Sequence, residues 1–324
     1  MLARSALSPA VLPKTMLAAR VHAFGPVDAI VLENVPVPRP RAGQVLVQVE
    51  AAGVGPWDGW VRSGRSALPQ PLPLTPGAEI SGIVAVAPDG APFQVGDAVF
   101  GVTNARFTDG AAQYALAAIG MLARKPATLS HIEAASIPVV AVTAWAMAFD
   151  HAHLRAGQTV FVHGGAGNVG AYAVQLARGR GVKVVASALP QNADRVRALG
   201  AEIVELPSPT VKVLAQSFDA VLDTVGADHE ALFGLLKPGG VLVSSVRQPD
   251  PALAERHGVR GVFFVVEVTT QRLEDLARLF GAGDLKVTIG DIVPLARVRE
   301  AHEMLEGLRP HHAGKIVLTM TGPS

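Results

Sequence analysis

One stretch, residues 159–181, restricts the fold of this chain more than any other: TVFVHGGAGNVGAYAVQLARGRG. Its first four residues are β-branched or aromatic and predict a short buried strand. The chain then turns through Gly165-x-Gly167-x-x-Gly170 into a segment whose apolar residues have helical spacing. A glycine pattern of this kind is informative when it follows a strand and opens a helix, and both conditions hold here.

The three glycines each have a predicted mechanical role. We expect Gly165 to allow the tight turn, Gly167 to leave room for a pyrophosphate, and Gly170 to let the helix lie close to its strand. The helix N-terminus would offer unpaired N–H groups and a positive dipole end to the anion. The alternative is an ordinary glycine-rich loop. We therefore predict a dinucleotide site with these contacts: Gly165, Ala166, Gly167, Asn168 and Val169.

Composition excludes several classes of protein. A length of 324 residues allows two domains, and 49% hydrophobic residues allow large cores. The net charge of +1 gives no sign of a nucleic-acid or membrane partner. The chain has no cysteine, which excludes disulfides, thiolate catalysis and thiolate metal sites and fits an intracellular, cytoplasmic enzyme. No apolar run approaches the roughly 20 residues of a membrane span.

The first part of the chain is rich in strands. Residues 1–15 read as a loose extension or the product of an upstream start codon, with a signal peptide as the alternative. After them, closely spaced β segments broken by Gly and Pro predict a compact, irregular β-barrel. These segments are residues 18–23, 30–35, 44–51, 80–86 and 97–102.

A glycine-rich loop, residues 53–64, interrupts these strands. It contains Trp57, Asp58, Trp60 and Arg62, which are unusual residues for a simple connection. We expect this loop to contact substrate. The alternative is a structural plug in which the aromatic rings cap the barrel.

From about residue 131 strands alternate with helices. A helical segment at 133–149 precedes the strand–turn–helix unit, and further helices are expected at 192–199, 272–280 and 295–308. The later strands are expected at residues 182–186, 201–206, 218–224, 240–246, 258–268 and 315–319. Alternating strands and helices predict a doubly wound parallel sheet, so the fold class is α/β. The crossover at 207–217 is short and Pro-rich, and the last strand returns to the first domain.

The motifs together resemble the medium-chain dehydrogenase/reductase superfamily, and within it the zinc-free quinone oxidoreductase branch. The matching residues include Pro76-Gly77-x-Glu79-x-Ser81-Gly82, Val95-Gly96-Asp97-x-Val99, Thr143-Ala144-Trp145, Asp223-Thr224-Val225-Gly226 and Gly314-Lys315-Ile316-Val317-Leu318. The resemblance implies a GroES-like β-barrel catalytic domain at residues 16–132 and 285–324, and a Rossmann domain at residues 133–284.

The resemblance also shows where this chain departs from zinc members of the family. Those members carry Cys and His at the positions of Gly55 and Ala78. A catalytic zinc needs about three protein ligands, so we expect no metal, and we expect Glu79 to orient its loop. Quinone reductases of this branch often have Asn at position 55 and Tyr at position 60, where this chain has Gly55 and Trp60. The pocket should therefore be more apolar, and its proton donor is unidentified.

The resemblance assigns further site residues. Asp58 and Trp60 are the catalytic candidates, and both would shape the substrate pocket, although Asp58 can also be read as structural. Thr143 would lie beside the nicotinamide, and Lys315 would contact the cofactor. The other cofactor contacts implied here are Val225 and Val246.

The end of the second strand of the Rossmann domain bears on cofactor choice. An NAD site places an acid there to bind the ribose 2′-OH, whereas this chain has Ser187 and no acid before Asp194. Ser187 and the nearby Arg195 can bind a 2′-phosphate, although the phosphate-contacting Lys of the family is Asn192 here. Arg195 and its neighbour Arg197 can also be read as a solvated helix face. The sequence favours NADPH over NADH.

We therefore expect a metal-independent, NADPH-dependent reductase of quinones or enones, because a conjugated substrate accepts hydride at carbon without a metal. The alternatives are a reductase of another activated double bond and a cofactor-binding regulatory protein without turnover. The apolar segment at residues 262–266 ends the predicted sheet. An open edge of this kind favours a homodimer.

Overall fold

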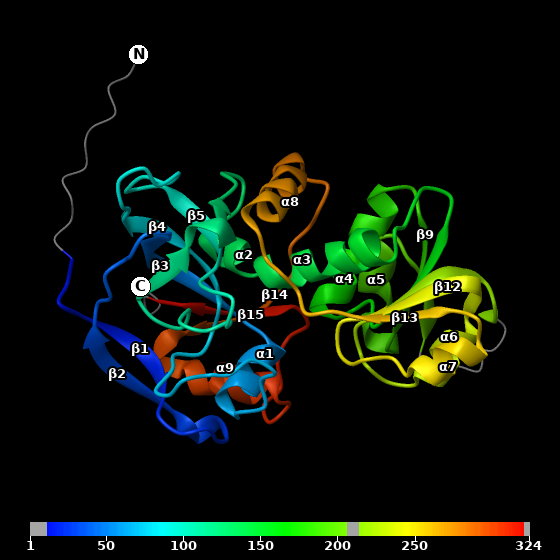
Figure 1. Cartoon of the computed structure of the whole chain (residues 1–324), viewed down its shortest axis with the longest axis horizontal. Coiled ribbons are helices and arrows are strands. Elements are labelled where there is room, and N and C mark those ends of the chain that lie inside the picture. Colours follow the sequence, from blue (N-terminus) through cyan, green and yellow to red (C-terminus); the bar gives the residue numbers. More distant parts are fainter. Residues whose placement is uncertain (1–11, 206–213, 321–324) are drawn as a thin grey trace, which may run out of the picture. The chain divides into compact units, whose positions relative to one another are not determined.

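The computed structural model describes residues 12–205 and 214–320 (Figure 1). The chain divides into two compact units. Unit 1 comprises Met1–Pro138, Val268–Gly281 and Val287–Ser324, and unit 2 comprises Val139–Glu267 and Ala282–Lys286. Each unit is described separately below.

Unit 1 is built from β-strands, most of them antiparallel. In its described residues, β1 pairs with β2, and a larger sheet has the order β14-β15-β3-β4-β5-β7, with β6 paired to β3. β14 and β15 are parallel. The strands are β1 (Thr15–Val21), β2 (Ile30–Pro36), β3 (Gln44–Val54), β4 (Glu79–Val86), β5 (Ala98–Val102), β6 (Tyr114–Ala118), β7 (Leu122–Arg124), β14 (Ile289–Pro294) and β15 (Lys315–Thr319).

Short helices surround these strands. Ser130 begins α2 with a reciprocal capping box, because its hydroxyl accepts from the Glu133 N–H while the Glu133 side chain accepts from the Ser130 N–H. The helices of unit 1 are η1 (Val27–Ala29), α1 (Pro56–Arg62), η2 (Ile119–Met121), α2 (His131–Ala135), α8 (Thr270–Ala282, whose last residue belongs to unit 2), η6 (Leu295–Arg297) and α9 (Val298–Leu305).

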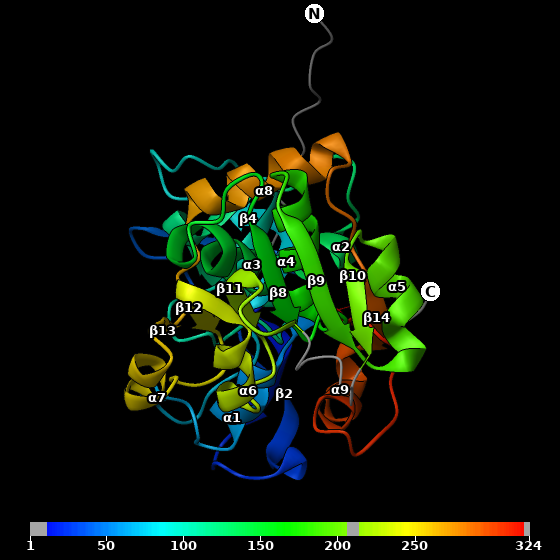
Figure 2. The same cartoon turned by 90° about the vertical axis from the view of Figure 1, so that its right-hand side faces the viewer.

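Unit 2 contains a parallel sheet whose order among the described residues is β10-β9-β8-β11-β12-β13. Chain order reverses at β8 and β11, as in the doubly wound dinucleotide-binding fold. Figure 2 shows β8, β9 and β10 side by side. The strands are β8 (Thr159–His163), β9 (Lys183–Ala188), β10 (Glu202–Glu205), β11 (Phe218–Asp223), β12 (Leu236–Ser244) and β13 (Arg260–Phe263). The α/β fold class predicted from the sequence is confirmed.

Two helices of unit 2, α3 and η3, precede its first strand in the chain, and the others follow it. Val160, Phe161 and Val162 on β8 are almost completely buried, as expected for a strand covered on both faces. The helices are α3 (Pro138–Trp145, from its second residue on), η3 (Ala146–His151, a π-helix), α4 (Asn168–Gly179), η4 (Pro190–Asn192), α5 (Ala193–Ala198), α6 (His229–Gly234) and α7 (Pro251–Arg256).

Several expectations from the sequence differ from the structure. The predicted loop at 53–64 contains helix α1, because Pro56 at the first helical turn supplies a favourable φ. The sixth strand of the sheet is shorter than the predicted 258–268, since β13 ends at Phe263. The sequence analysis does not predict β6, β7, β14, α6 and α7. Most of the predicted crossover at 207–217 lies outside the described residues.

The sequence places helix α8 in the cofactor domain, but most of it belongs to unit 1. The Thr270 hydroxyl is within hydrogen-bond distance of two carbonyl oxygens, 3.1 Å from that of Ile119 and 2.7 Å from that of Leu122. These contacts are about 150 residues apart in sequence. Local periodicity predicts the helix but cannot indicate this long-range attachment.

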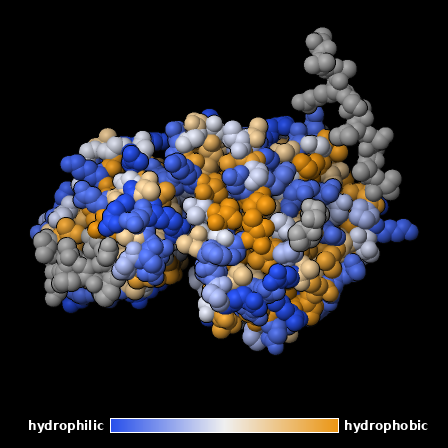
Figure 3. Space-filling view, turned by 180° about the vertical axis from the view of Figure 1, so that it is seen from behind, coloured by the Kyte–Doolittle hydropathy of each residue, from blue (hydrophilic) through white to orange (hydrophobic). Residues whose placement is uncertain are grey.

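The surface carries exposed apolar side chains among polar ones, and Figure 3 shows hydrophobic residues interspersed with hydrophilic ones on one face. Trp60, Val225, Val246, Phe263 and Val265 are among the exposed apolar residues. Within residues 12–205 and 214–320, no helix combines the length and the apolar character needed to cross a membrane.

Candidate functional site

The candidate site residues fall into two groups, one in each unit. The glycine-rich turn, Thr143, Ser187, Arg195, Val225 and Val246 belong to unit 2, whereas Asp58, Trp60 and Lys315 belong to unit 1. The chemistry of each group follows from the contacts within its own unit.

In unit 2, β8 ends at His163 and α4 begins after Gly167. The residue that turns the chain is Gly164, with φ of 86°, rather than Gly165 as the sequence suggested. Gly165 is needed for space instead, because a Cβ there would lie 2.7 Å from the Cβ of Ala186. Gly170 has the expected role of close packing, since its Cβ would meet the Gly164 oxygen at 2.2 Å.

Gly167 lies at the N-terminus of α4 and is exposed. A Cβ there would contact only the Gly164 oxygen, at 3.3 Å. The protein itself therefore does not require glycine at this position as strongly as at Gly165 or Gly170. Open space at a helix N-terminus suits a bound anion.

Ser187, at the end of β9, holds the glycine-rich turn in place. Its hydroxyl accepts a hydrogen bond from the Gly164 N–H at 3.0 Å, and its carbonyl accepts one from the Gly165 N–H at 2.9 Å. The side chain is buried, with 1% of its surface exposed. Its visible role is to shape the turn, and contact with a 2′-phosphate stays a prediction.

Arg195 reaches from α5 back to the same turn. Its Nη2 donates to the Ala166 carbonyl oxygen, and its Nε is buried without a hydrogen-bond partner among the described residues. Burial lowers the pKa of the guanidinium, which nevertheless stays charged. Arg197 instead pairs with the exposed Asp194 at 2.8 Å. Thus a cation with unused donor capacity lies beside the glycine-rich turn.

Val225 and Val246 extend the same region. A Cβ on Gly164 would lie 2.7 Å from a methyl group of Val225, and a Cβ on Gly226 would lie 2.7 Å from a methyl group of Val246. The two valines are 49% and 37% exposed. The structure therefore brings together the ends of β8, β11 and β12, where ligands bind in doubly wound sheets.

A buried polar network that the sequence analysis did not identify connects these strand ends. Asp223 accepts from the Ser244 hydroxyl at 2.8 Å and pairs with His163 and His229 at 2.9 and 3.0 Å. The N–H groups of Val225 and Gly226 also donate to it. The presence of Asp223 and His163 at the ends of two predicted strands was the only available signal.

The network keeps the Asp223 carboxylate charged. Burial by itself raises the pKa of this carboxyl, but donors from His163, Gly226, His229 and Ser244 outweigh it and hold the pKa well below its usual range. The carboxylate thereby orders the segment after β11, which carries Val225.

Thr143 lies on α3 and is 6% exposed. Its hydroxyl donates to the Val139 carbonyl oxygen at 2.7 Å, the usual contact of a helical threonine with the preceding turn. A role beside a nicotinamide ring stays a prediction.

In unit 1, α1 places Asp58 and Trp60 on different faces, because residues two positions apart in an α-helix point in directions about 200° apart. Asp58 is fully buried and its Oδ2 accepts from the Gly55 N–H at 2.8 Å, whereas Trp60 is 43% exposed. The structure therefore does not bring the two catalytic candidates together. Trp60 can meet a substrate, and Asp58 lies beneath the helix.

Burial raises the pKa of Asp58 from 3.8 to about 7. The Gly55 N–H, the Lys315 ammonium and the Gly77 backbone oppose this rise, while the Glu79 carboxylate adds to it. Asp58 Oδ1 has no hydrogen-bond partner among the described residues. A carboxyl in this environment retains its proton near neutral pH more readily than an exposed one.

Lys315, at the start of β15, forms a buried ion pair with Glu79 at the start of β4. The side chains are 3% and 0% exposed. The Lys315 Nζ lies 4.4 Å from the centre of the Trp57 ring. The sequence analysis expected Lys315 to contact the cofactor, and its observed contacts are those within unit 1.

A second ion pair ties α1 to α9. Arg62, 1% exposed, pairs with Glu306. His302 on α9 is buried as well, and burial together with the Arg62 charge lowers its pKa to about 3. These contacts were not predicted, because Arg62 and Glu306 are 244 residues apart.

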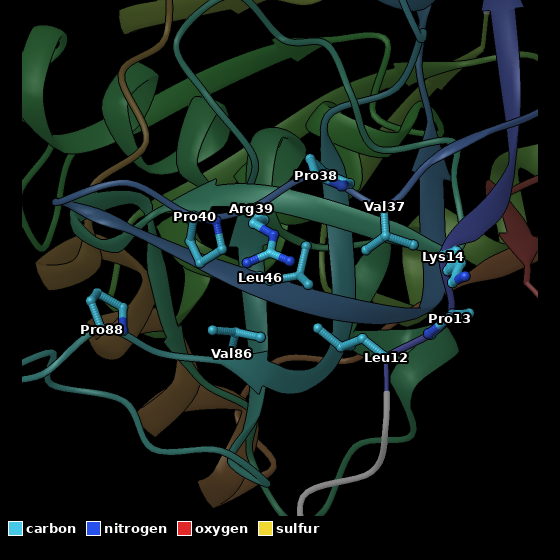
Figure 4. A pocket seen from close by; sticks show the side chains of 10 residues that line it. All are labelled: Leu12, Pro13, Lys14, Val37, Pro38, Arg39, Pro40, Leu46, Val86 and Pro88. Atoms are coloured by element: carbon cyan, nitrogen blue, oxygen red, sulfur yellow. The ribbon is translucent and has the colours of Figure 1, made fainter.

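A hollow of about 590 Å³ lies elsewhere in unit 1 (Figure 4). Lys14 and Arg39 are the charged side chains among the described residues lining it, and prolines and aliphatic residues form much of the remainder. It shares no residue with the Asp58–Glu79–Lys315 cluster or the glycine-rich turn. It supplies no acid or imidazole for proton transfer, so we do not assign the chemistry to it.

Two family models match the chain. One, described as an alcohol dehydrogenase GroES-like domain, matches residues 41–132, and the other, described as a zinc-binding dehydrogenase, matches residues 199–318.

Known proteins match along almost the full length. A quinone oxidoreductase of Pongo abelii is 32% identical over 311 residues, covering 90% of this chain and 94% of that protein. A 2-methylene-furan-3-one reductase of Solanum lycopersicum is 31% identical over 324 residues, covering 95% and 80%. The solved structure of a mycobacterial protein complexed with NADPH has a TM-score of 0.82 and 26% identity, covering 94% and 99%.

The residues of this chain do not fit a catalytic zinc. Positions 55 and 78 hold Gly and Ala, and the chain has no cysteine. Among the described residues, no group of three or more His, Asp or Glu side chains is arranged to hold a metal ion. The buried Lys315 cation close to Asp58 and Glu79 would also oppose a second cation there.

We predict that Asp58→Asn stabilises the protein increasingly as pH rises. The folded-state pKa of Asp58 is about 7, above its ordinary value of 3.8. The protonated Asp58 carboxyl therefore makes its full contribution to the free energy of unfolding below about pH 4. This contribution is lost as pH rises through 7 and the carboxyl ionises in the folded protein. Asparagine stays neutral and can still accept from the Gly55 N–H. The difference in free energy of unfolding between variant and wild type should grow by about 3 kcal/mol from pH 5 to pH 8.

Urea unfolding at the two pH values measures this difference. Asp194→Asn is the control, because the Asp194 side chain is 99% exposed, and its effect should be nearly the same at both values. A pH-independent effect of Asp58→Asn would show that Asp58 is already ionised at pH 5.

Proposed function

The chain belongs to the medium-chain dehydrogenase/reductase superfamily and is quinone oxidoreductase-like within it, and from this premise we propose that it is an NADPH-dependent, metal-independent reductase of quinones or enones. The observation that carries the proposal is the open glycine-rich turn at the N-terminus of α4, with Arg195 beside it and no acid at the end of β9.

The residues of unit 2 fit a dinucleotide. The turn from Gly165 to Val169 would bind its pyrophosphate, and Val225 and Val246 would offer apolar contacts. Arg195 would bind the 2′-phosphate through donors that the Ala166 carbonyl does not use. The cofactor supplies the hydride, and Thr143 is proposed to lie beside its nicotinamide.

The substrate class follows from the missing metal ligands. Without a metal to polarise a carbonyl group, hydride transfer is easier to a carbon conjugated with that carbonyl. The names of the two relatives describe a quinone and a ketone conjugated with a methylene group. Both substrates have this kind of acceptor carbon.

In unit 1, we assign Trp60 and Asp58 different tasks. The exposed Trp60 ring is proposed to contact the substrate, and the buried Asp58 to set the position of α1 from beneath. The ammonium of Lys315 is already paired with Glu79. We therefore propose that Lys315 stabilises the packing of unit 1 and does not bind the cofactor directly. We propose a cytoplasmic location, in keeping with the absence of cysteine.

The first prediction of this proposed function concerns cofactor choice. We expect kcat/KM for NADPH to exceed that for NADH, and Arg195→Gln to reduce the NADPH value by about 10- to 100-fold, as expected for one charge-assisted hydrogen bond. The NADH value should change much less, because NADH has no 2′-phosphate. Arg197→Gln is the matched control, since Arg197 pairs with Asp194. Equal losses with both cofactors would indicate that Arg195 acts only by holding Ala166.

The second prediction concerns the reaction. Purified protein should oxidise NADPH in the presence of quinones or enones, retain this activity in a chelator, and turn over simple alcohols poorly. Elemental analysis should find no stoichiometric zinc. About one tightly bound zinc per chain, with activity lost on its removal, would contradict the proposal, and NADPH binding without turnover of any substrate would favour a regulatory protein.

The third prediction is a homodimer. β13 is an edge strand of the described sheet. Its last residue, Phe263, is 37% exposed, and the nearby Val265 is 62% exposed. An apolar open edge favours pairing with a second copy. Light scattering at micromolar concentration should give twice the 33.6 kDa chain mass. Val265→Lys should yield monomers, whereas Leu308→Lys, at a 72% exposed residue of unit 1, should not.

A further inference from the structure

Gly55, directly before α1, is covered by the side chain of Trp57. A Cβ built on Gly55 would lie 2.2 to 2.4 Å from three carbon atoms of the Trp57 indole. The backbone of Gly55 does not itself require glycine, because its φ of −140° is available to any residue. Glycine is therefore needed here for the space that the Trp57 ring occupies.

The Trp57 ring also contacts a buried cation. Lys315 Nζ lies 4.4 Å from the ring centre and forms an ion pair with Glu79. Such a distance allows a cation–π interaction, which is stronger away from water. Three segments distant in sequence, namely α1, β4 and β15, thus meet around one ammonium group.

The contacts of Asp58 indicate that positions 55 and 78 lie close to the cluster of Trp57, Lys315 and Glu79. Its carboxylate accepts from the Gly55 N–H, and the Gly77 backbone, directly before Ala78, also acts on it. The electrostatic influence of both Lys315 and Glu79 reaches the same carboxyl. The places where zinc members of the family carry Cys and His therefore border one buried cluster.

We propose that Trp57, Lys315 and Glu79 form a plug that replaces the metal centre of zinc-containing family members. The indole fills the space that a ligand at position 55 would need, and the Lys315 ammonium supplies a fixed positive charge opposite Glu79. Lys315 is then a positioning residue that holds Trp57 and, through it, the start of α1. The plug excludes a metal ion by the volume of the indole, and restoring the two ligands alone does not restore metal binding.

Cobalt(II) is the probe for the first test. Gly55→Cys/Ala78→His should show no thiolate-to-cobalt absorption at stoichiometric Co²⁺, whereas the same variant with Trp57→Ala should show it, with Asp58 able to act as a third donor. Stoichiometric cobalt binding by the double variant would overturn the proposal. Failure of the triple variant to bind cobalt, when circular dichroism shows it folded, would also overturn it.

Fluorescence tests the role of Lys315. A Trp60→Phe/Trp145→Phe background leaves Trp57 as the remaining tryptophan of the chain's three. Adding Lys315→Met should shift the Trp57 emission to longer wavelength, and adding Lys315→Arg should shift it less, because arginine keeps the charge. Equal emission in all three proteins would refute the positioning role. Neither test uses quinone turnover, so each remains valid whether or not the proposed reaction is correct.

Discussion

The close approach of the glycine-rich turn to the start of α4 is the constraint on which unit 2 depends. At Gly170 any side chain would collide with the Gly164 carbonyl oxygen, so α4 can begin where it does only with glycine there. Ser187 then fixes the turn to β9 through two main-chain N–H groups, and Asp223 fixes the adjoining ends of β8, β11 and β12. The proposed cofactor site thus lies on backbone that is held from both sides.

In unit 1, ion pairs with buried members add to the β-sheet and its apolar core by joining segments that are distant in sequence. Removing one partner of a buried ion pair leaves an uncompensated charge and is strongly destabilising. The Lys315–Glu79 pair therefore joins β15 to β4 firmly, and the Arg62–Glu306 pair joins α1 to α9. Trp57, near the start of α1, contacts Lys315, and Arg62, at the end of α1, pairs with Glu306. The exposed Trp60 is therefore carried on a helix that is supported at both ends. Precise placement of a substrate contact requires this kind of support.

Much of the fold could be predicted from the sequence, because strong local patterns decide it. The run from Thr159 to Val162 predicts a buried strand by composition alone, and the turn after it predicts the helix. The partners of charged side chains could not be predicted in the same way, since Lys315 meets Glu79 across 236 positions of the chain. Nor could the local pattern show that Asp58 is buried and Trp60 exposed, because residues 53–64 were interpreted as a loop with no defined faces.

The glycines of the two units show why a motif can be recognised before its physical reason is known. Gly164 and Gly77 have φ of 86° and serve the path of the chain, whereas Gly55, Gly165 and Gly170 serve the space of a neighbour: an indole, a methyl group and a carbonyl oxygen. These reasons differ in what can replace the glycine. A glycine with positive φ is required by its own backbone conformation. A glycine without room for a Cβ is required by the neighbouring residue that fills this space, and a smaller neighbour would remove the requirement. Gly55 and Trp57 are such a pair, because the Trp57 ring occupies the space that a side chain at position 55 would need.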